Sequence, residues 1–297
     1  MLTSARIAGW ARDALLLPRV AMLAARAPRD WRAGWERYWG SITVTGVGGD
    51  VLWDTGDLDE TQTYRKLIRE NLDTSLPLVD AGCGNGRFTR GLAPLFPSTI
   101  GVDLARNAVL RARAESAGWT DLTFQTLDVT VPDAARPLAA AIGRDVNVFV
   151  RGVLHVLGPA DRVVAARNLR ALVGSQGRLL LAETNFLGSK MDYLRHLGAS
   201  PRHIPDPLRR AITDTPAPRH FGPDERRAAF PATDWTVVED GVVDILTIPL
   251  HAHPAPDAEH VPGYYAILAP ATGSTTEPSP SAEGSSPPWT RQVADTE

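Results

Sequence analysis

Five short apolar runs alternate with helical stretches between residues 75 and 183, and this alternation limits the possible folds of the chain. Helical patterns lie between the runs and are clearest at Asn107–Ser116 and Ala160–Val173. Strands that alternate with helices at this spacing form right-handed crossover units around a parallel sheet. The sequence therefore predicts a doubly wound α/β domain. Its five buried strands are expected at Leu78–Ala81, Thr99–Val102, Thr123–Thr126, Asn147–Val150 and Arg178–Ala182.

The regions on either side of this core differ from it in pattern. Residues 1–74 are rich in tryptophan and are expected to be helical, with one helix from about Asp59 to Asn71. Residues 184–232 are irregular, with several prolines and room for a helix or two, one of them opening near Pro223. The tail, residues 271–297, is rich in Ser, Pro, Gly, Thr and Glu and is expected to be disordered. Further strands are expected at Thr236–Val238, Val242–Ile248 and Tyr264–Leu268.

Composition and charge argue against several classes of protein. The formal net charge of −3 provides no field that would attract nucleic acid or an anionic membrane, so neither is an expected partner. Cys83 is the only cysteine, so no internal disulfide is possible, which fits a reducing, cytoplasmic location. The apolar stretch at residues 14–25 is interrupted by Pro18 and Arg19. It predicts neither a signal peptide nor a membrane span, which needs about 20 apolar residues.

A glycine-rich turn follows the first predicted strand. The segment Asp80–Gly86 reads Asp-Ala-Gly-Cys-Gly-Asn-Gly and leads into a helix that starts near Arg87. Glycines allow the backbone to turn tightly and to approach a ligand at the carboxyl end of the strand. The turn alone indicates nucleotide binding. An NAD-type site remains an alternative, although the G-x-G-x-x-G spacing of such sites is absent.

Three acidic residues stand where the first three strands end. Asp80 precedes the glycines, where a carboxylate can meet a cationic amine and is of no use to a pyrophosphate. Asp103 ends the second strand, where it can accept hydrogen bonds from both ribose hydroxyls. Asp128 follows the third strand, where it can accept from an adenine amino group. An amine, a ribose and an adenine together indicate S-adenosylmethionine.

With these three acids in order, the chain resembles the class I S-adenosylmethionine-dependent methyltransferase family over about residues 75–270. The resemblance implies a seven-stranded, mostly parallel sheet with an antiparallel last strand, an N-terminal helical lid at 1–74 and a substrate-side insert at 184–232. It also implies that the glycine turn holds the methionine part of the cofactor, the second acid the ribose and the third the adenine. The matching positions are Asp80, Gly82, Gly84, Asn85 and Gly86, then Asp103 and Leu104, then Asp128 and Val129.

The segment after the fourth strand supplies candidates close to the reacting methyl group. In many relatives, backbone at this place lies beside the methionine part of the cofactor and a later histidine lies near the acceptor; Arg151 and His155 match these places. Arg151 can bind the cofactor carboxylate or brace a loop through a salt bridge. His155 can be a general base if the acceptor must lose a proton, or a packed structural histidine.

The acceptor is expected to contact the N-terminal region and the insert. Trp39 and Trp53 resemble, in layout only, the aromatic lid of thiopurine-type methyltransferases, and they can equally belong to the core. Asn185 and Tyr193, together with His155, are the other candidates for contacting the acceptor. Aromatic side chains suit an apolar or planar acceptor and also a cationic sulfonium.

Two further features favour plain structural interpretations. The histidines of the His251–His260 loop match no defined zinc pattern, so no metal is predicted, while contact with the rim of the substrate site stays open. Cys83 lies between two glycines and is expected to pack beneath the turn.

The sequence therefore predicts in-line transfer of a methyl group from S-adenosylmethionine to a small molecule, by O- or N-methylation, with a specialised metabolite as the acceptor class. In-line displacement requires the protein mainly to align the reacting groups and exclude water. Two rival functions remain: a methyltransferase fold that catalyses a cyclisation or rearrangement, and a non-catalytic cofactor-binding module.

Overall fold

A seven-stranded sheet runs through the computed structural model, which describes residues 15–55, 58–247 and 259–271. The strand order is β3-β2-β1-β4-β5-β7-β6, and the first five strands are parallel. The strand β7 (Glu259–Pro270) pairs antiparallel with both of its neighbours, β5 and β6 (Trp235–Thr247). The predicted fold class is thus confirmed. The parallel strands are β1 (Leu78–Ala81), β2 (Thr99–Asp103), β3 (Leu122–Thr126), β4 (Asn147–Arg151) and β5 (Leu179–Thr184).

Helices cover both faces of this sheet, because alternate residues of each buried strand point to opposite sides. Val79 and Val148 pack with α7 (Pro159–Val173) and with the residues after α10 (Pro223–Ala229). The neighbouring Leu78 and Phe149 pack with α3 (Asp59–Asn71) and α4 (Arg87–Leu92). The strands β1, β4 and β5 are therefore buried on both faces of the sheet. Two more helices complete the layers, α5 (Arg106–Glu115) and α6 (Arg136–Ile142), with short 3-10 turns at η1 (Ala93–Leu95) and η2 (Leu154–Val156).

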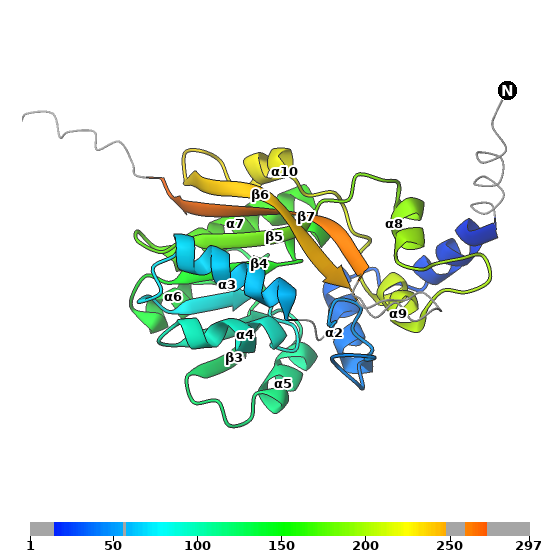
Figure 1. The fold of residues 1–297 in the computed structure, drawn as a ribbon, viewed down its shortest axis with the longest axis horizontal. Helices are drawn as coiled ribbons and strands as arrows, with labels where there is room; N and C mark the ends of the chain where they lie inside the picture. Colours follow the sequence, from blue (N-terminus) through cyan, green and yellow to red (C-terminus); the bar gives the residue numbers. More distant parts are fainter. Residues whose placement is uncertain (1–14, 56–57, 248–258, 272–297) are drawn as a thin grey trace, which may run out of the picture.

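Four helical segments gather at the end of the sheet where the parallel strands finish (Figure 1), and together they form the cap. They are residues 15–24, α2 (Trp31–Ser41), α8 (Lys190–His196) and α9 (Asp206–Asp214). Asp30 starts α2 by accepting a hydrogen bond from the Arg32 amide. Arg37 of α2 donates to the Asp214 carboxylate of α9 over 2.7 Å. The N-terminal region and the insert are thus joined to each other above the sheet.

The structure differs from the sequence prediction in two elements. A single strand, β6, replaces the two strands expected around Asp240-Gly241, with a register shift between Val237 and Glu239. The insert contains three helices, and Ser189 and Asp192 form a capping box at the start of α8. The expected disordered tail and most of the His251–His260 loop lie outside the described residues.

Candidate active site

A cavity of about 980 Å³ lies at the carboxyl ends of the parallel strands, beneath the cap. The glycine turn and the ends of β2, β3 and β4 line one side, and residues from all four segments of the cap line the other. Ligands of open α/β sheets bind at this edge. The volume is at the upper end of the roughly 300–1,000 Å³ typical of small-molecule sites.

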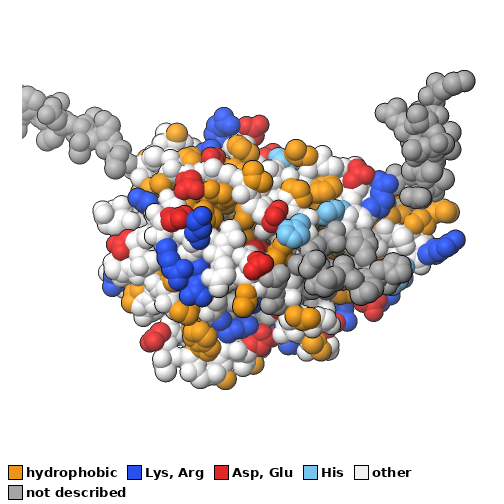
Figure 2. All heavy atoms as spheres, in the orientation of Figure 1, with side chains coloured by type: hydrophobic (Ala, Val, Ile, Leu, Met, Phe, Trp, Pro, Cys, Tyr) orange, Lys and Arg blue, Asp and Glu red, His pale blue; other side chains and the backbone are white. Residues whose placement is uncertain are grey.

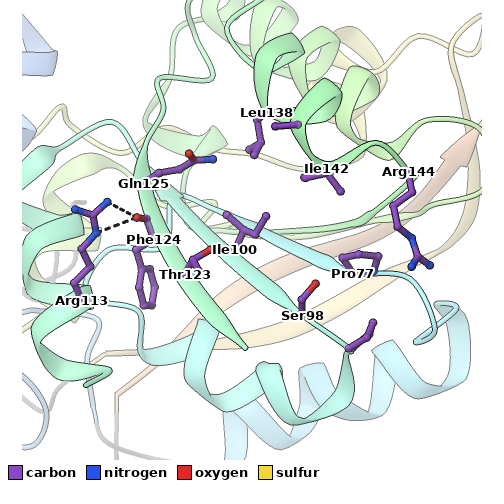
Figure 3. A pocket seen from close by; sticks show the side chains of 12 residues that line it. Pro77, Ser98, Ile100, Arg113, Thr123, Phe124, Gln125, Leu138, Ile142 and Arg144 are labelled. Carbon is purple, nitrogen blue, oxygen red and sulfur yellow. Dashed lines mark hydrogen bonds between the residues drawn. The ribbon is translucent and has the colours of Figure 1, made fainter. Parts of the chain in front are cut away.

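A second, more open hollow of about 540 Å³ lies toward the opposite edge, between the β2–β3 face and α6 (Figure 3). Its lining contains neither a carboxylate, a histidine nor a cysteine. The guanidinium of Arg113 already donates two hydrogen bonds to the Phe124 carbonyl, and Arg144 donates to the Ser75 carbonyl. This hollow thus offers no acid–base group, whereas the larger cavity contains several.

The glycine turn presents bare backbone to the larger cavity. Gly82 and Gly84 line it with φ angles of +83° and +55°, a region that favours glycine. A Cβ at Gly82 would clash with Val153, and one at Gly84 would lie 2.8 Å from the Trp39 ring. Gly86 is not on the cavity wall, since it packs against Phe124. Its direct contact with the cofactor, expected from the sequence, is therefore replaced by a role in packing the turn.

Asp103 holds the shape of this turn from the end of β2. Its carboxylate lines the cavity and accepts hydrogen bonds from the Gly84 amide (3.0 Å) and the Ala105 amide (2.9 Å). Burial raises the pKa of Asp103 to about 6, although the two amide donors oppose this shift. A buried acceptor fixed in this way is suited to hydroxyl donors. The neighbouring Leu104 lines the same wall.

Asp80 lies beneath the turn and does not reach the cavity. Its carboxylate is 2 % exposed and accepts a hydrogen bond of 2.6 Å from the Thr89 hydroxyl of α4. Burial raises the pKa of Asp80 to about 7, against the opposing effect of Thr89. The sequence placed this acid against the cofactor amine, but the structure gives it a supporting position, since its strand ends under the glycines.

Asp128 lies on the cavity wall with Val129 and is held by the cap. One carboxylate oxygen accepts from the amide and hydroxyl of Thr130, and the other lies 2.6 Å from the Arg32 Nε of α2. The Arg32 guanidinium also donates to the Thr130 hydroxyl and stacks over Trp31. Sequence reasoning did not identify Arg32, because it precedes Asp128 by 96 residues.

Arg151 braces the scaffold, which was the alternative to carboxylate binding. Its guanidinium makes two hydrogen bonds to Glu60 of α3, of 2.9 and 3.0 Å, and a third to the Leu246 carbonyl of β6. Glu60 is buried and also accepts from Tyr64 and the Leu246 amide. Arg151 lines the cavity with these donors engaged in a buried pair, and the cofactor contact expected for it stays a prediction.

Arg87 is the arginine at the glycine turn that lines the cavity. It begins α4, lies over the Phe88 ring and has its Nε 3.4 Å from the Asp54 carboxylate. Asp54 also accepts a 2.8 Å hydrogen bond from the side-chain Nδ2 of Asn85, and Asn85 lines the cavity too. Its position one residue after the last glycine was a signal that the sequence analysis did not use.

His155 and Glu183 form a buried pair where β4 and β5 end. The His155 Nδ1 lies 2.8 Å from one Glu183 oxygen, and Glu183 also accepts from the backbone amides of Val153, Leu154 and His155. Glu183 is fully buried, whereas the imidazole lines the cavity. Because an ionised carboxylate only accepts hydrogen bonds, Nδ1 carries the proton. The Nε2 lone pair of His155 has no hydrogen-bond partner among the described residues.

Comparisons with known proteins agree with this geometry. Residues 79–179 match a family described as a methyltransferase domain. The solved structure of an S-adenosylmethionine-dependent methyltransferase from Anabaena variabilis superposes with a TM-score of 0.70 and 25% identity, covering 82% of this chain and 96% of that one. The chain is a class I S-adenosylmethionine-dependent methyltransferase.

Two curated relatives support this identification at lower coverage. A methyltransferase of Schizosaccharomyces pombe is 25% identical over 184 residues, which span 51% of this chain and 71% of the relative. Nodulation protein S of Bradyrhizobium diazoefficiens is 24% identical over 135 residues, 45% of this chain and 59% of the relative. The matched core of the methyltransferase contains the glycine turn and the acids at the strand ends.

The methyltransferase cavity brings together most of the expected acceptor residues. Trp39, Trp53, His155 and Tyr193 all line it. The two tryptophans pack edge to face and belong to an aromatic cluster with Trp35 and Tyr38. The exception is Asn185, which lies behind the wall near Gly222.

Thr247 and His220 also line the cavity and were missed by the sequence analysis. The Thr247 hydroxyl and the His220 Nδ1 are buried and have no hydrogen-bond partner within the described part of the chain. They are therefore available to a bound ligand.

Metal clusters and membrane-spanning helices were searched for among the described residues. No group of three or more metal-binding side chains occurs among them. None of their helices combines the length and apolar character that crossing a bilayer requires.

Proposed function

We propose that this methyltransferase transfers its methyl group to an oxygen or nitrogen atom of a small molecule, with His155 as the general base. The observation that carries the proposal is the His155–Glu183 pair. The His155 Nδ1–H donates its hydrogen bond to Glu183, so the Nε2 lone pair is presented to the cavity. A proton leaving a hydroxyl or ammonium group can then be accepted at Nε2. The buried carboxylate stabilises the resulting imidazolium.

The residues around the turn fit S-adenosylmethionine, whose sulfonium supplies an activated methyl group. The open backbone at Gly82 and Gly84 leaves room for close approach of a ligand. We assign Asp103 with Leu104 to the ribose, and Asp128 with Val129 to the adenine.

For the carboxylate of the cofactor we assign Arg87, because Arg151 is committed to Glu60. Asn85 positions this arginine through their shared partner Asp54. Asp80 and Gly86 support the turn from below.

A small-molecule acceptor fits the enclosure of the site. The cap covers the strand ends, so the cavity is bounded by side chains from four separate segments. The face drawn in Figure 2 carries basic and acidic side chains interspersed, without a broad basic area for a nucleic acid. We therefore assign residues 1–74 and the insert at 184–232 to the choice of acceptor, and the core of 75–270 to the cofactor.

The experiment that tests this function uses radiolabelled S-adenosylmethionine with a panel of hydroxylated and amino compounds. We expect label in an acceptor together with equimolar S-adenosylhomocysteine. The variant His155→Ala should lower kcat by about 10²-fold or more. Its affinity for S-adenosylhomocysteine should stay at the wild-type value.

Glu183→Gln serves as the companion variant, because it keeps His155 but removes the acceptor for its Nδ1 proton. We expect an intermediate loss of kcat. Full activity of His155→Ala across the pH range would overturn the base assignment. Cofactor binding without any methylated acceptor would favour one of the rival functions.

A further inference from the structure

Charges on the wall of the cavity are divided between its two halves. The carboxylates that line it, within the described residues, are Asp54, Asp103 and Asp128, and all three belong to the half around the glycine turn and strand ends. The half formed by the insert and the cap is lined by no carboxylate. Its ionisable lining groups are Lys190, Tyr193, Arg219 and His220, and His155 borders this half from the end of β4.

Two of these groups, Lys190 and Arg219, are cations with no counter-ion in the described part of the chain. Neither the Lys190 ammonium nor the Arg219 guanidinium forms a hydrogen bond or an ion pair there. The two histidines differ, since Glu183 lies 2.8 Å behind His155 and Glu225 lies 3.6 Å from His220. Lys190 and Arg219 therefore add positive charge to the acceptor half that its own wall does not balance.

The backbone of Arg219 is hydrogen-bonded to the backbone of His155, the proposed base. Its amide donates a 2.9 Å hydrogen bond to the His155 carbonyl. The backbone of Arg219 therefore lies beside the base, and its side chain lines the same cavity. An acceptor with an anionic group close to its reacting atom would place that group near Arg219.

The rest of the acceptor half is apolar. Residues from three segments of the cap face one another there and belong to one hydrophobic cluster, with the N-terminal helix contributing Val20, α8 contributing Met191 and Leu194, and α9 contributing Leu208 and Ile212. Such a surface favours a ligand whose own apolar surface it removes from water. The acceptor half therefore suits a molecule with an apolar body.

We propose that the acceptor is an amphipathic carboxylic acid, with its carboxylate at Lys190 and Arg219 and its apolar body against the cap. The proposal rests on the proposed function, because it names the substrate class of the same site. A carboxylate neutralises cations that otherwise lack a partner. A cationic acceptor of the same shape would be repelled, which gives the site selectivity by charge.

The test measures binding of dodecanoate and dodecylamine by calorimetry, with S-adenosylhomocysteine present. These probes share an apolar body and differ in the sign of the head group. We expect dodecanoate to bind the wild-type protein about tenfold or more tightly than dodecylamine. The double variant Lys190→Gln, Arg219→Gln should lose this preference. The matched control Arg202→Gln, an exposed arginine of the same insert outside the cavity lining, should keep it.

Each result separates this inference from the proposed function. Equal binding of the two probes, or an equal loss in Arg202→Gln, would overturn the inference. If S-adenosylhomocysteine binds and another class of small molecule is methylated, the proposed function stands without it. Unfolding curves of each variant establish that the fold is intact. Filling the apolar part of the acceptor half with Ala211→Trp should weaken the binding of both probes alike. Unchanged affinities would contradict the placement of the apolar body.

Discussion

Two buried glutamates organise this site, and each does so by accepting four hydrogen bonds. Glu60 accepts from Arg151, Tyr64 and the Leu246 amide, and thereby engages the donors of an arginine on the cavity wall. Glu183 accepts from three backbone amides and the His155 ring, and thereby directs a base into the cavity. Similar buried carboxylates thus have opposite consequences for the chemistry, because their partners face different ways.

Asp80 provides a prediction at the scale of a single residue. Burial raises its pKa to about 7, far above the ordinary value of an aspartate. The folded state therefore binds this proton more tightly than the unfolded state, and the stabilisation is lost as the pH rises through about 7. Asp80→Asn removes the ionisation, and its uncharged amide oxygen can still accept the Thr89 hydrogen bond.

We expect Asp80→Asn to be more stable than the wild type at about pH 8.5, by roughly 2–4 kcal/mol, and to keep only about a third of this advantage near pH 5. Urea unfolding at both pH values measures the difference. Thr89→Val is the companion variant, because it removes the hydrogen bond that favours the charged form and should lower stability most at the higher pH. An advantage for Asp80→Asn that does not depend on pH would contradict the buried titration.

At the scale of elements, strands and helices of the core followed from the sequence, whereas the pairing of the cap did not. The strands are short apolar runs between turn residues, and α3 was predicted with the observed bounds, Asp59–Asn71. The contacts that hold the cap join residues far apart in the chain, such as Arg37 with Asp214. The same distance concealed the Arg151–Glu60 pair, whose members are separated by 91 residues. Local patterns locate elements, but they do not reveal which side chains meet.

The attachment of α2 can be tested through Arg32. Arg32→Ala removes both the ion pair with Asp128 and the hydrogen bond to Thr130, so we expect faster amide hydrogen exchange in α2 and unchanged exchange in α7. Because Arg32 is 38% exposed, the loss in global stability should stay within about 1 kcal/mol. The control is Arg136→Ala, which breaks an exposed pair with Asp133 far from the cap. Equal effects of both variants on α2 would contradict the anchoring role.

At the scale of the whole molecule, one edge of the sheet collects residues from almost every part of the chain. The cofactor half is built by the crossover units of the core, and the acceptor half by segments that precede and interrupt them. The two halves share one cavity, so a ligand in the cofactor half also contacts residues that belong to the cap. Trp39 makes this link directly, because it belongs to α2 and lies against Gly84 of the turn.

This shared wall predicts that cofactor binding stabilises the cap as well as the turn. We expect S-adenosylhomocysteine to slow amide hydrogen exchange in α2 and in the glycine turn, and to leave α6, which has no residue on the cavity wall, unchanged. Asp103→Ala removes the acceptor at the end of β2, so it should weaken the ligand about 10-fold or more and abolish protection at the same ligand concentration. Protection limited to the turn would show that the cap does not respond to the cofactor. In that case binding of the acceptor alone would have to order the acceptor half of the cavity.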